Sequence, residues 1–309
     1  MGKSEYKIKT SDNQEVHVYE WIPEDIHNII AVIQIAHGMA EHAARYDDFA
    51  LFLNKHGYAV FANDHKGHGK TAGTLENLGY FADENGFLQV VNDMRSLTDK
   101  INERFPDKSV FLLGHSMGSF LSRYYSIENS SKLKGLILSG TAGHPGMLGK
   151  VGKILSSIII TFNGRKSQTP LMTKLSFGAF NNAFKPNRTE YDWLSRDNKV
   201  VDEYINDLFC GTIFTVGFYN DLLGGLLHVN NQTEINKTAK ELPVYLLAGD
   251  KDPVSENGKG VTEVYEKYKK AGLNDVEIKL YPDARHEILN EKNRAEVYYD
   301  ILNWLEKRL

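Results

Sequence analysis

The chain has 309 residues, of which 36 are lysine or arginine and 40 are aspartate or glutamate, so its formal net charge at neutral pH is −4. This balance excludes the basic surface that binds nucleic acid or strongly anionic membranes. The single cysteine, Cys210, cannot form an internal disulfide, which favours a reducing compartment. No signal segment opens the sequence and no apolar stretch reaches the roughly 20 residues of a membrane span, so a cytoplasmic, soluble protein is predicted.

Strand and helix patterns alternate along the first part of the chain. Strands are predicted at residues 5–9, 16–21, 29–36, 58–62, 109–113 and 133–138. Apolar residues at three-to-four spacing predict a helix that ends before Pro106: Leu88, Val91, Met94, Leu97, Ile101 and Phe105. This alternation predicts an α/β fold with a mostly parallel central sheet flanked by helices on both faces.

The motif Gly114-His115-Ser116-Met117-Gly118 follows the apolar run 109–113 directly and precedes a helix-like stretch. A strand-to-helix turn with this pattern exposes the serine oxygen as a nucleophile. Glycines suit such a turn because side chains would crowd its strained backbone. The sequence therefore predicts that Ser116 is a catalytic nucleophile, although the motif alone would also fit an ordinary glycine-rich connection.

The alternation stops after Gly143, and residues 144–235 show no convincing core strand. We interpret this segment as a mainly helical cap inserted into a core formed by residues 1–143 and 236–309. In its first helix, one face is apolar and is expected to pack on the core: Met147, Leu148, Val151, Ile154, Leu155, Ile158 and Ile159. Polar residues are expected on the opposite side: Lys150, Lys153, Ser156 and Ser157.

Two further strands, at residues 242–248 and 276–281, each precede a candidate partner for Ser116. Asp252 lies deep in the loop after the strand at 242–248. It precedes a proline, which favours an extended backbone at Asp252. Asp250 is instead expected to form a turn by bonding the backbone two residues on. His286 follows the second strand and can accept the serine proton. The order nucleophile, acid, histidine is that of the α/β-hydrolases.

An acyl-transfer serine also needs donors for the oxyanion of its tetrahedral intermediate. The N–H of Met117 follows the nucleophile directly, and the N–H of Met39 lies in the loop after the strand at 29–36. These two groups are the predicted oxyanion hole. His37, in the same loop, is expected to brace it through hydrogen bonds.

No cofactor or metal is predicted from the sequence. The histidines His37, His42, His65 and His68 lack the paired spacing of known metal sites. A phosphate-binding loop is excluded at residues 69–71, because Asp64 stands where that motif needs glycine.

With these residues in this order, the chain resembles the monoacylglycerol lipase and lysophospholipase branch of the α/β-hydrolases, which includes serine aminopeptidase-like members. The resemblance covers nearly the whole length and is carried by residues 37–42, 45–46, 64–69, 114–118, 252–253 and 285–291. Lys66 departs from it, because relatives usually have arginine there. The resemblance implies an esterase that cleaves monoacylglycerol or lysophospholipid acyl esters through Ser116, His286 and Asp252.

A small acyl ester is thus the expected partner, and the cap is expected to supply its apolar pocket. The candidate lining residues are Ile158, Phe177, Phe180, Phe214 and Phe218. Part of the first cap helix is a candidate for transient contact with lipid surfaces. The oligomeric state is not readable from the sequence.

Two other functions remain open at this point. A peptidase or amidase would use the same triad with a cap that recognises an amine, and four acidic residues of the cap keep this alternative open: Glu190, Asp192, Asp202 and Glu203. A ligand receptor that retains an inactive hydrolase pocket is disfavoured by the intact set of site residues. Epoxide-hydrolase chemistry is disfavoured because it usually places aspartate where Ser116 stands.

Overall fold

The computed structural model describes residues 2–172 and 178–309. Within these residues, eight strands form one sheet with the order β1-β2-β4-β3-β5-β6-β7-β8. Their bounds are β1 (Gly2–Lys9), β2 (Glu15–Ile22), β3 (Ala31–Ala36), β4 (Tyr58–Asn63), β5 (Val110–His115), β6 (Gly135–Ser139), β7 (Val244–Gly249) and β8 (Val276–Tyr281). β1, β2 and β4 pair antiparallel, and every later pair is parallel, which confirms the predicted mostly parallel sheet.

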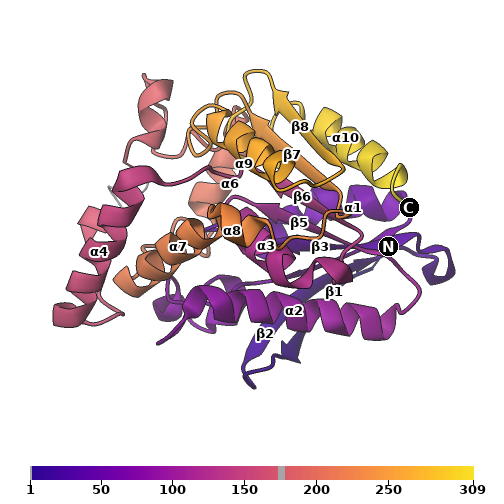
Figure 1. The fold of residues 1–309 in the computed structure, drawn as a ribbon, viewed down its shortest axis with the longest axis horizontal. Coiled ribbons are helices and arrows are strands. Elements are labelled where there is room, and N and C mark those ends of the chain that lie inside the picture. The colour runs from indigo at the N-terminus through magenta and orange to yellow at the C-terminus, as the bar shows by residue number, and fades with distance from the viewer. Residues whose placement is uncertain (1, 173–177) are drawn as a thin grey trace.

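Helices cover both faces of this sheet (Figure 1). They are α1 (Asp47–Lys55), α2 (Gly86–Arg104), α3 (Met117–Asn129), α9 (Lys259–Lys270) and α10 (Arg294–Glu306). α2, α3 and α9 share one apolar core with residues such as Val32, whereas α1 and α10 share another with its neighbour Ile33. Successive strand residues point to opposite faces, so the central strands β3 to β7 are buried on both sides and are mostly apolar.

Between β6 and β7 the chain forms the mainly helical insertion that the sequence predicted. Its described elements are α4 (Gly146–Asn163), the short 3-10 helix η6 (Phe180–Phe184), α6 (Asn198–Asn206), α7 (Val216–Val229) and α8 (Gln232–Ile235). Further 3-10 turns are η1 (Ile26–Asn28), η2 (Ala43–Tyr46), η3 (Gly69–Ala72), η4 (Leu75–Asn77), η5 (Ser130–Lys132) and η7 (Ile288–Asn290). In the part of the chain that the structure describes, no helix is long and apolar enough to cross a bilayer.

The preferred orientation of α4, with its apolar face on the core, is wrong for most of that face, although Ile159 does pack on the core. α4 packs along α7 at the outer edge of the molecule (Figure 1), and it does so through its polar side. The ammonium of Lys153 donates to the backbone and side-chain oxygens of Asn220 at 2.8 and 2.6 Å, and the Asn220 amide donates to Ser156 Oγ at 2.9 Å. The polar groups of α7 thus find their partners in the polar stripe of α4.

The opposite side of α4 is left to solvent. Its large apolar side chains are between 50% and 83% exposed: Met147, Leu148, Val151, Ile154, Ile158 and Phe162. These six residues are called the α4 apolar face below. Isolated exposed apolar residues are ordinary, but a contiguous group of this kind on one helix marks an interaction surface.

Candidate active site

Ser116 lies in a strained turn between β5 and α3. Its φ is +52° and its ψ is −120°, a conformation that residues with side chains rarely adopt. Its backbone N–H donates to Ser139 O at 2.9 Å. A methyl group at Gly118 would lie 2.0 Å from Ala36 O, and one at Gly114 would lie 2.4 Å from Gly118 O. Both glycines of the motif are therefore required by the close approach of β3, β5 and α3.

Asp252 and His286 meet in the loops after β7 and β8. The Nδ1 of His286 lies 2.9 Å from Asp252 Oδ1, and both side chains are buried. Burial opposes protonation of His286, but the charge and hydrogen bond of Asp252 outweigh it and raise the pKa of His286 above its ordinary value. The pair thus has the geometry in which a carboxylate orients an imidazole and stabilises its protonated form.

The turn after β6 lies between this pair and Ser116. Ser139 accepts the hydrogen bond from Ser116, and a methyl group on the next residue, Gly140, would lie 3.0 Å from the His286 ring. The ring of His115 packs on His286 with centroids 4.7 Å apart. The structure therefore brings Ser116, Asp252 and His286 to the same edge of the sheet, where the carboxyl ends of its parallel strands meet.

Asp250 does not form the turn that the sequence predicted. The bond to the backbone two residues on is made by Asp252, whose Oδ1 also accepts from Val254 N at 2.9 Å. Asp250 Oδ1 accepts instead from Asp283 N at 2.8 Å, in the loop after β8. Since β7 and β8 are neighbours in the sheet, this bond holds together the two loops that carry Asp252 and His286.

Both segments that carry the predicted oxyanion donors pass close to Ser116. Met117 is the first residue of α3, and Met39 belongs to the loop after β3. That loop passes close to the serine, because a methyl group on Gly38 would lie 3.3 Å from Ser116 Cβ. Among the hydrogen bonds of residues 2–172 and 178–309, none uses the N–H of Met39 or of Met117. Both groups are therefore available to an oxyanion.

His37 braces this loop, as predicted. Its Nδ1 lies 2.8 Å from Gly38 O, and its Nε2 accepts from His65 N at 2.9 Å. Because one nitrogen accepts, the other carries the proton and the ring is neutral. Burial lowers the pKa of His37 to about 3, which agrees with this assignment. The rings of His65 and His68 pack against it with centroids 4.1 and 5.2 Å away.

A buried charge network, to which the sequence assigned no role, links the Met39 loop to the His286 loop. Arg45 donates to Glu41 Oε2 at 2.8 Å and to both oxygens of Glu287 at 2.6 and 2.7 Å. Glu41 Oε1 in turn accepts from Gly38 N at 2.5 Å and from the Tyr46 hydroxyl at 2.8 Å. Burial works against ionisation of the two glutamates, but Arg45 outweighs it and lowers the pKa of each. We call these three charged residues the Arg45 network.

Lys66 is the position at which the resemblance implies arginine. It lies in the loop after β4 and contacts the turn between β1 and β2 as well as helix α2. Its ammonium donates to Asp12 Oδ2 at 2.6 Å and to Gln89 Oε1 at 3.2 Å, and it lies 3.9 Å from Asp93 Oδ2. Burial raises the pKa of Asp93 to about 7, because the charge of Lys66 compensates only part of the lost hydration of this carboxylate.

The predicted lining residues occupy different environments. Phe214 and Phe218 are fully buried and pack on each other and on His68, so they build the core beneath the insertion. Phe180 packs on Trp193, whose ring lies 5.3 Å from that of His286. Ile158 belongs to the exposed α4 apolar face, and Phe177 lies outside the described residues.

Trp193 was missed by the sequence analysis. It lies between η6 and α6, and its backbone oxygen accepts from His286 N at 3.4 Å. Its ring covers the imidazole from the side of the insertion, where a large apolar group shields the histidine from water. A lone tryptophan in an irregular segment carries no periodicity, so no sequence signal pointed to this position.

Comparison with known proteins agrees with this geometry. The model of the serine aminopeptidase S33 family matches residues 27–293. The monoglyceride lipase of Mus musculus is 27% identical over 307 residues, covering 98% of this chain and 90% of that protein. The monoacylglycerol lipase of Mycolicibacterium smegmatis is 28% identical over 300 residues, covering 94% and 93%.

Among solved structures, a highly thermostable carboxyl esterase from Bacillus coagulans, in complex with glycerol, matches with a TM-score of 0.92 and 28% identity. The match covers 100% of this chain and 99% of that one. The whole chain thus follows proteins that hydrolyse carboxylic esters, in sequence as well as in fold. The protein belongs to the serine aminopeptidase S33 family, has the α/β-hydrolase fold and is a carboxylic ester hydrolase.

Proposed function

We propose that Ser116, His286 and Asp252 form a catalytic triad that hydrolyses acyl esters of glycerol. The observation that carries this proposal is the convergence of the strained Ser116 turn with the buried pair of His286 and Asp252, whose Nδ1 and Oδ1 atoms are 2.9 Å apart. A serine exposed by such a turn, beside a histidine oriented by a carboxylate, is the arrangement that activates a hydroxyl for acyl transfer.

In the first half of the reaction, Ser116 Oγ attacks the ester carbonyl while His286 Nε2 takes the serine proton. The N–H groups of Met39 and Met117 hold the oxyanion, and Asp252 stabilises the imidazolium. His286 then gives its proton to the leaving alcohol, and the acyl group stays on Ser116. In the second half, His286 takes a proton from water and the hydroxide attacks the acyl-enzyme. His286 then returns the proton to Ser116 Oγ as the carboxylic acid leaves, which restores the free enzyme.

Monoacylglycerol is the substrate class that the relatives favour. The two curated relatives described above are named monoglyceride and monoacylglycerol lipases, and the Bacillus coagulans esterase was solved with glycerol. Glycerol is the alcohol released when a monoacylglycerol is hydrolysed. Lysophospholipid esters share the glycerol unit and an acyl chain, and they form the second substrate class to be tested.

The test compares hydrolysis of monoacylglycerols and lysophospholipids of increasing chain length with hydrolysis of para-nitrophenyl esters from two to sixteen carbons. We expect turnover to peak at medium or long chains and to vanish in Ser116→Ala and in His286→Ala. Ser11→Ala, an exposed serine far from the site in the sequence, is the matched control. Labelling by a fluorophosphonate should follow the same pattern. Esterase activity that survives either active-site substitution would refute the triad.

A peptidase using the same residues is the alternative, and aminoacyl anilides in the same assay distinguish it. Three of the four acidic residues that would recognise an amine have other partners in the structure, and the fourth, Glu190, is exposed. Asp202 pairs with Arg188 at 2.6 Å, Glu203 pairs with Lys199 at 3.7 Å, and Asp192 accepts from the backbone of Arg188 at 2.6 Å. This use of the carboxylates favours ester over amide substrates.

The insertion at residues 144–235 is, in this proposal, a cap that shapes the acyl pocket, and the α4 apolar face is its contact with lipid surfaces. Binding to phosphatidylcholine vesicles should weaken in Ile158→Asp, because a charge would then enter the apolar interface. Ile26→Asp places the same charge on an apolar residue that is 58% exposed on η1, and it should leave binding unchanged. Equal binding by wild type and Ile158→Asp would exclude this surface.

A further inference from the structure

Three side chains that can bind metal ions meet where the loop after β3 contacts the chain after α6. They are His42, Asp207 and Cys210, and one ligand atom from each lies within 4.8 Å of the others. His42 Nε2 and Asp207 Oδ2 are only 2.8 Å apart, although 165 residues separate them in the sequence. The expectation of no metal rested on the spacing of the histidines and on their place in the hydrolase pattern, and neither observation detects a site assembled from distant segments.

The backbone holds these donors in place. Asp207 Oδ1 accepts from Phe209 N at 2.8 Å, so its other oxygen is the one that faces His42. Cys210 N donates to Asp207 O at 3.1 Å, and the following Gly211 N donates to Ala40 O at 3.0 Å. The turn after α6 is therefore bound directly to the loop that carries Met39 and His42.

The surroundings of this cluster favour a cation. Burial is the largest cause that raises the pKa of the Cys210 thiol, Arg45 lowers it, and the carboxylates of Asp207, Glu41 and Glu287 raise it further. Arg45 is itself engaged by Glu41 and Glu287. A negative local field of this kind attracts metal ions and compensates the charge that they bring.

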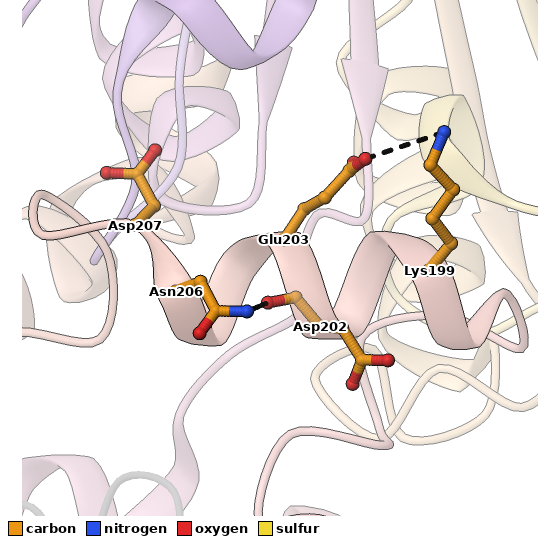
Figure 2. A pocket seen from close by; sticks show the side chains of 5 residues that line it. All are labelled: Lys199, Asp202, Glu203, Asn206 and Asp207. Carbon is orange, nitrogen blue, oxygen red and sulfur yellow. Dashed lines mark hydrogen bonds and ion pairs between the residues drawn. The ribbon is translucent and has the colours of Figure 1, made fainter.

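The cluster can be reached from solvent. Asp207 lines an open cavity of about 650 Å³ together with Lys199, Asp202, Glu203 and Asn206. Figure 2 shows its carboxylate beyond the end of α6, directed away from Asn206. The Asp207 side chain is 31% exposed and Cys210 is half-buried, whereas His42 lies deeper at 10%. An ion would thus enter past Asp207 and reach His42 last.

We propose that His42, Asp207 and Cys210 form a site for a divalent ion of zinc-like preference, with water in the fourth position. Imidazole, carboxylate and thiolate are the ligands that zinc takes in proteins. Donor atoms around tetrahedral zinc are about 3.3–3.8 Å apart, given bond lengths of about 2.0–2.3 Å. To reach that spacing, His42 Nε2 and Asp207 Oδ2 would separate by about 0.5–1 Å, and atoms at the 4.8 Å limit of the cluster would approach by about 1–1.5 Å. On binding, the Cys210 thiol proton goes to solvent and the ring proton of His42 moves from Nε2 to Nδ1.

Such an ion would affect the neighbouring active site. His42 follows Met39 by three positions, and Glu41 between them holds Gly38 N. An ion would widen the spacing between His42 Nε2 and Asp207 Oδ2 from 2.8 Å to about 3.3–3.8 Å. This would shift the loop relative to the turn after α6 and move the Met39 N–H away from the oxyanion. We therefore expect bound zinc to slow ester hydrolysis. This consequence rests on the proposed function, whereas the binding itself does not.

Cobalt(II) titration tests the site directly. Cys210 is the only cysteine in the sequence, so any thiolate-to-cobalt charge-transfer band reports coordination at this position. We expect a band that saturates at one ion per chain, is reversed by zinc competition and is lost in Cys210→Ser. The absence of a band at tenfold excess of cobalt would overturn the proposal.

A paired comparison distinguishes the three-residue site from a lone thiol. Asp207→Asn should weaken cobalt and zinc binding at least tenfold, because it removes an anionic ligand. Asp202→Asn changes a carboxylate of the same cavity that pairs with Arg188, and it should leave the affinity unchanged. Equal affinities of wild type and Asp207→Asn would show that Cys210 binds alone and would refute the site.

The activity measurement is separate. Micromolar zinc should slow ester hydrolysis by wild type, a chelator should restore the rate, and Cys210→Ser should resist inhibition. Equal inhibition of both proteins would place the inhibitory ion elsewhere, such as on His286, and would refute the coupling. The cobalt band is read without turnover, so failure of the proposed function would not be mistaken for failure of the metal site.

Discussion

Replacing Arg45 by methionine tests how much the Arg45 network stabilises the fold. The three side chains are at most 10% exposed, and the guanidinium contacts both glutamates within 2.8 Å. Removing one member of a buried ion pair costs about 3–5 kcal/mol, because the remaining charge is left without a partner. Here two carboxylates would be left close together. We expect Arg45→Met to lower the free energy of unfolding by about 3–5 kcal/mol, out of about 5–15 kcal/mol for a typical protein.

Urea denaturation followed by fluorescence measures this change. With an m value of about 3 kcal/mol/M, the transition midpoint should fall by about 1–1.7 M. The control combines Arg45→Met with Glu41→Gln and Glu287→Gln, which removes all three charges. Glutamine at position 41 keeps an oxygen that accepts from Gly38 N, so this triple variant should recover more than half of the lost stability.

Two results would refute this reasoning. If Arg45→Met costs less than about 1 kcal/mol, the two carboxylates are hydrated or neutral without the arginine, and the network is not a buried ion pair in solution. If the triple variant is as unstable as Arg45→Met, the loss comes from the packing of the guanidinium and not from stranded charge.

The remaining predictions concern pH and backbone contact. The pKa of His286 is raised, and His286 must be neutral to act as the base, so the acid limb of kcat/KM should lie above about pH 6.5. Asp252→Asn should move this limb to lower pH, because it removes the charge that raises the pKa, and should lower kcat by roughly 10⁴-fold. The pKa of Asp93 is raised to about 7, so the folded state binds an extra proton between about pH 4 and 7 and loses stability as pH rises through this window. Asp93→Asn should abolish that loss, and a wild-type midpoint no more pH-dependent than the variant's would contradict the assignment. Gly118→Ala places a methyl group 2.0 Å from Ala36 O, so it should lower the free energy of unfolding, measured by thermal denaturation, by about 1–3 kcal/mol. It should also remove most of the esterase activity. Unchanged activity would show that the turn tolerates separation from β3.

The central strands were predictable because they are buried on both faces and are mostly continuous apolar runs, as at 58–62, which lies within β4. The edge strand β8 was predictable for another reason: residues 276–280 alternate between apolar and charged side chains. The strand predicted at 29–36 begins later, at Ala31, because Ile30 is 45% exposed and its N–H bonds to Gly57 O. Hydrophobicity alone does not distinguish such a residue from the strand that follows it.

The orientation of α4 was not predictable from its amphipathic pattern. That pattern assumes that the apolar side faces the protein, whereas Asn220 on α7 offers polar partners to Lys153 and Ser156 instead. The partner residue lies more than sixty positions away and has no feature that marks it as buried. A helical pattern therefore indicates two faces but does not say which one is covered.

The candidate residues of the site could be predicted from the sequence, whereas the contacts between the loops that carry them could not. Ser116, Asp252 and His286 each follow a recognisable strand, so their order alone brought them together as candidates. Arg45 and Glu287 lie in motifs that the resemblance already contained, but a sequence of charges does not show which pairs are buried together. Contacts between loops depend on the order of strands in the sheet, and this order becomes visible only in the fold.

The bond between Arg45 and Glu287 joins residues 242 positions apart, and it has a consequence for how the enzyme is made. Loop closure over such a separation comes late, after the local elements have formed. During synthesis, Arg45 therefore leaves the ribosome long before its partner Glu287 does. We expect esterase activity to appear during refolding only once the segment that carries His286 and Glu287 has docked on the loop after β3.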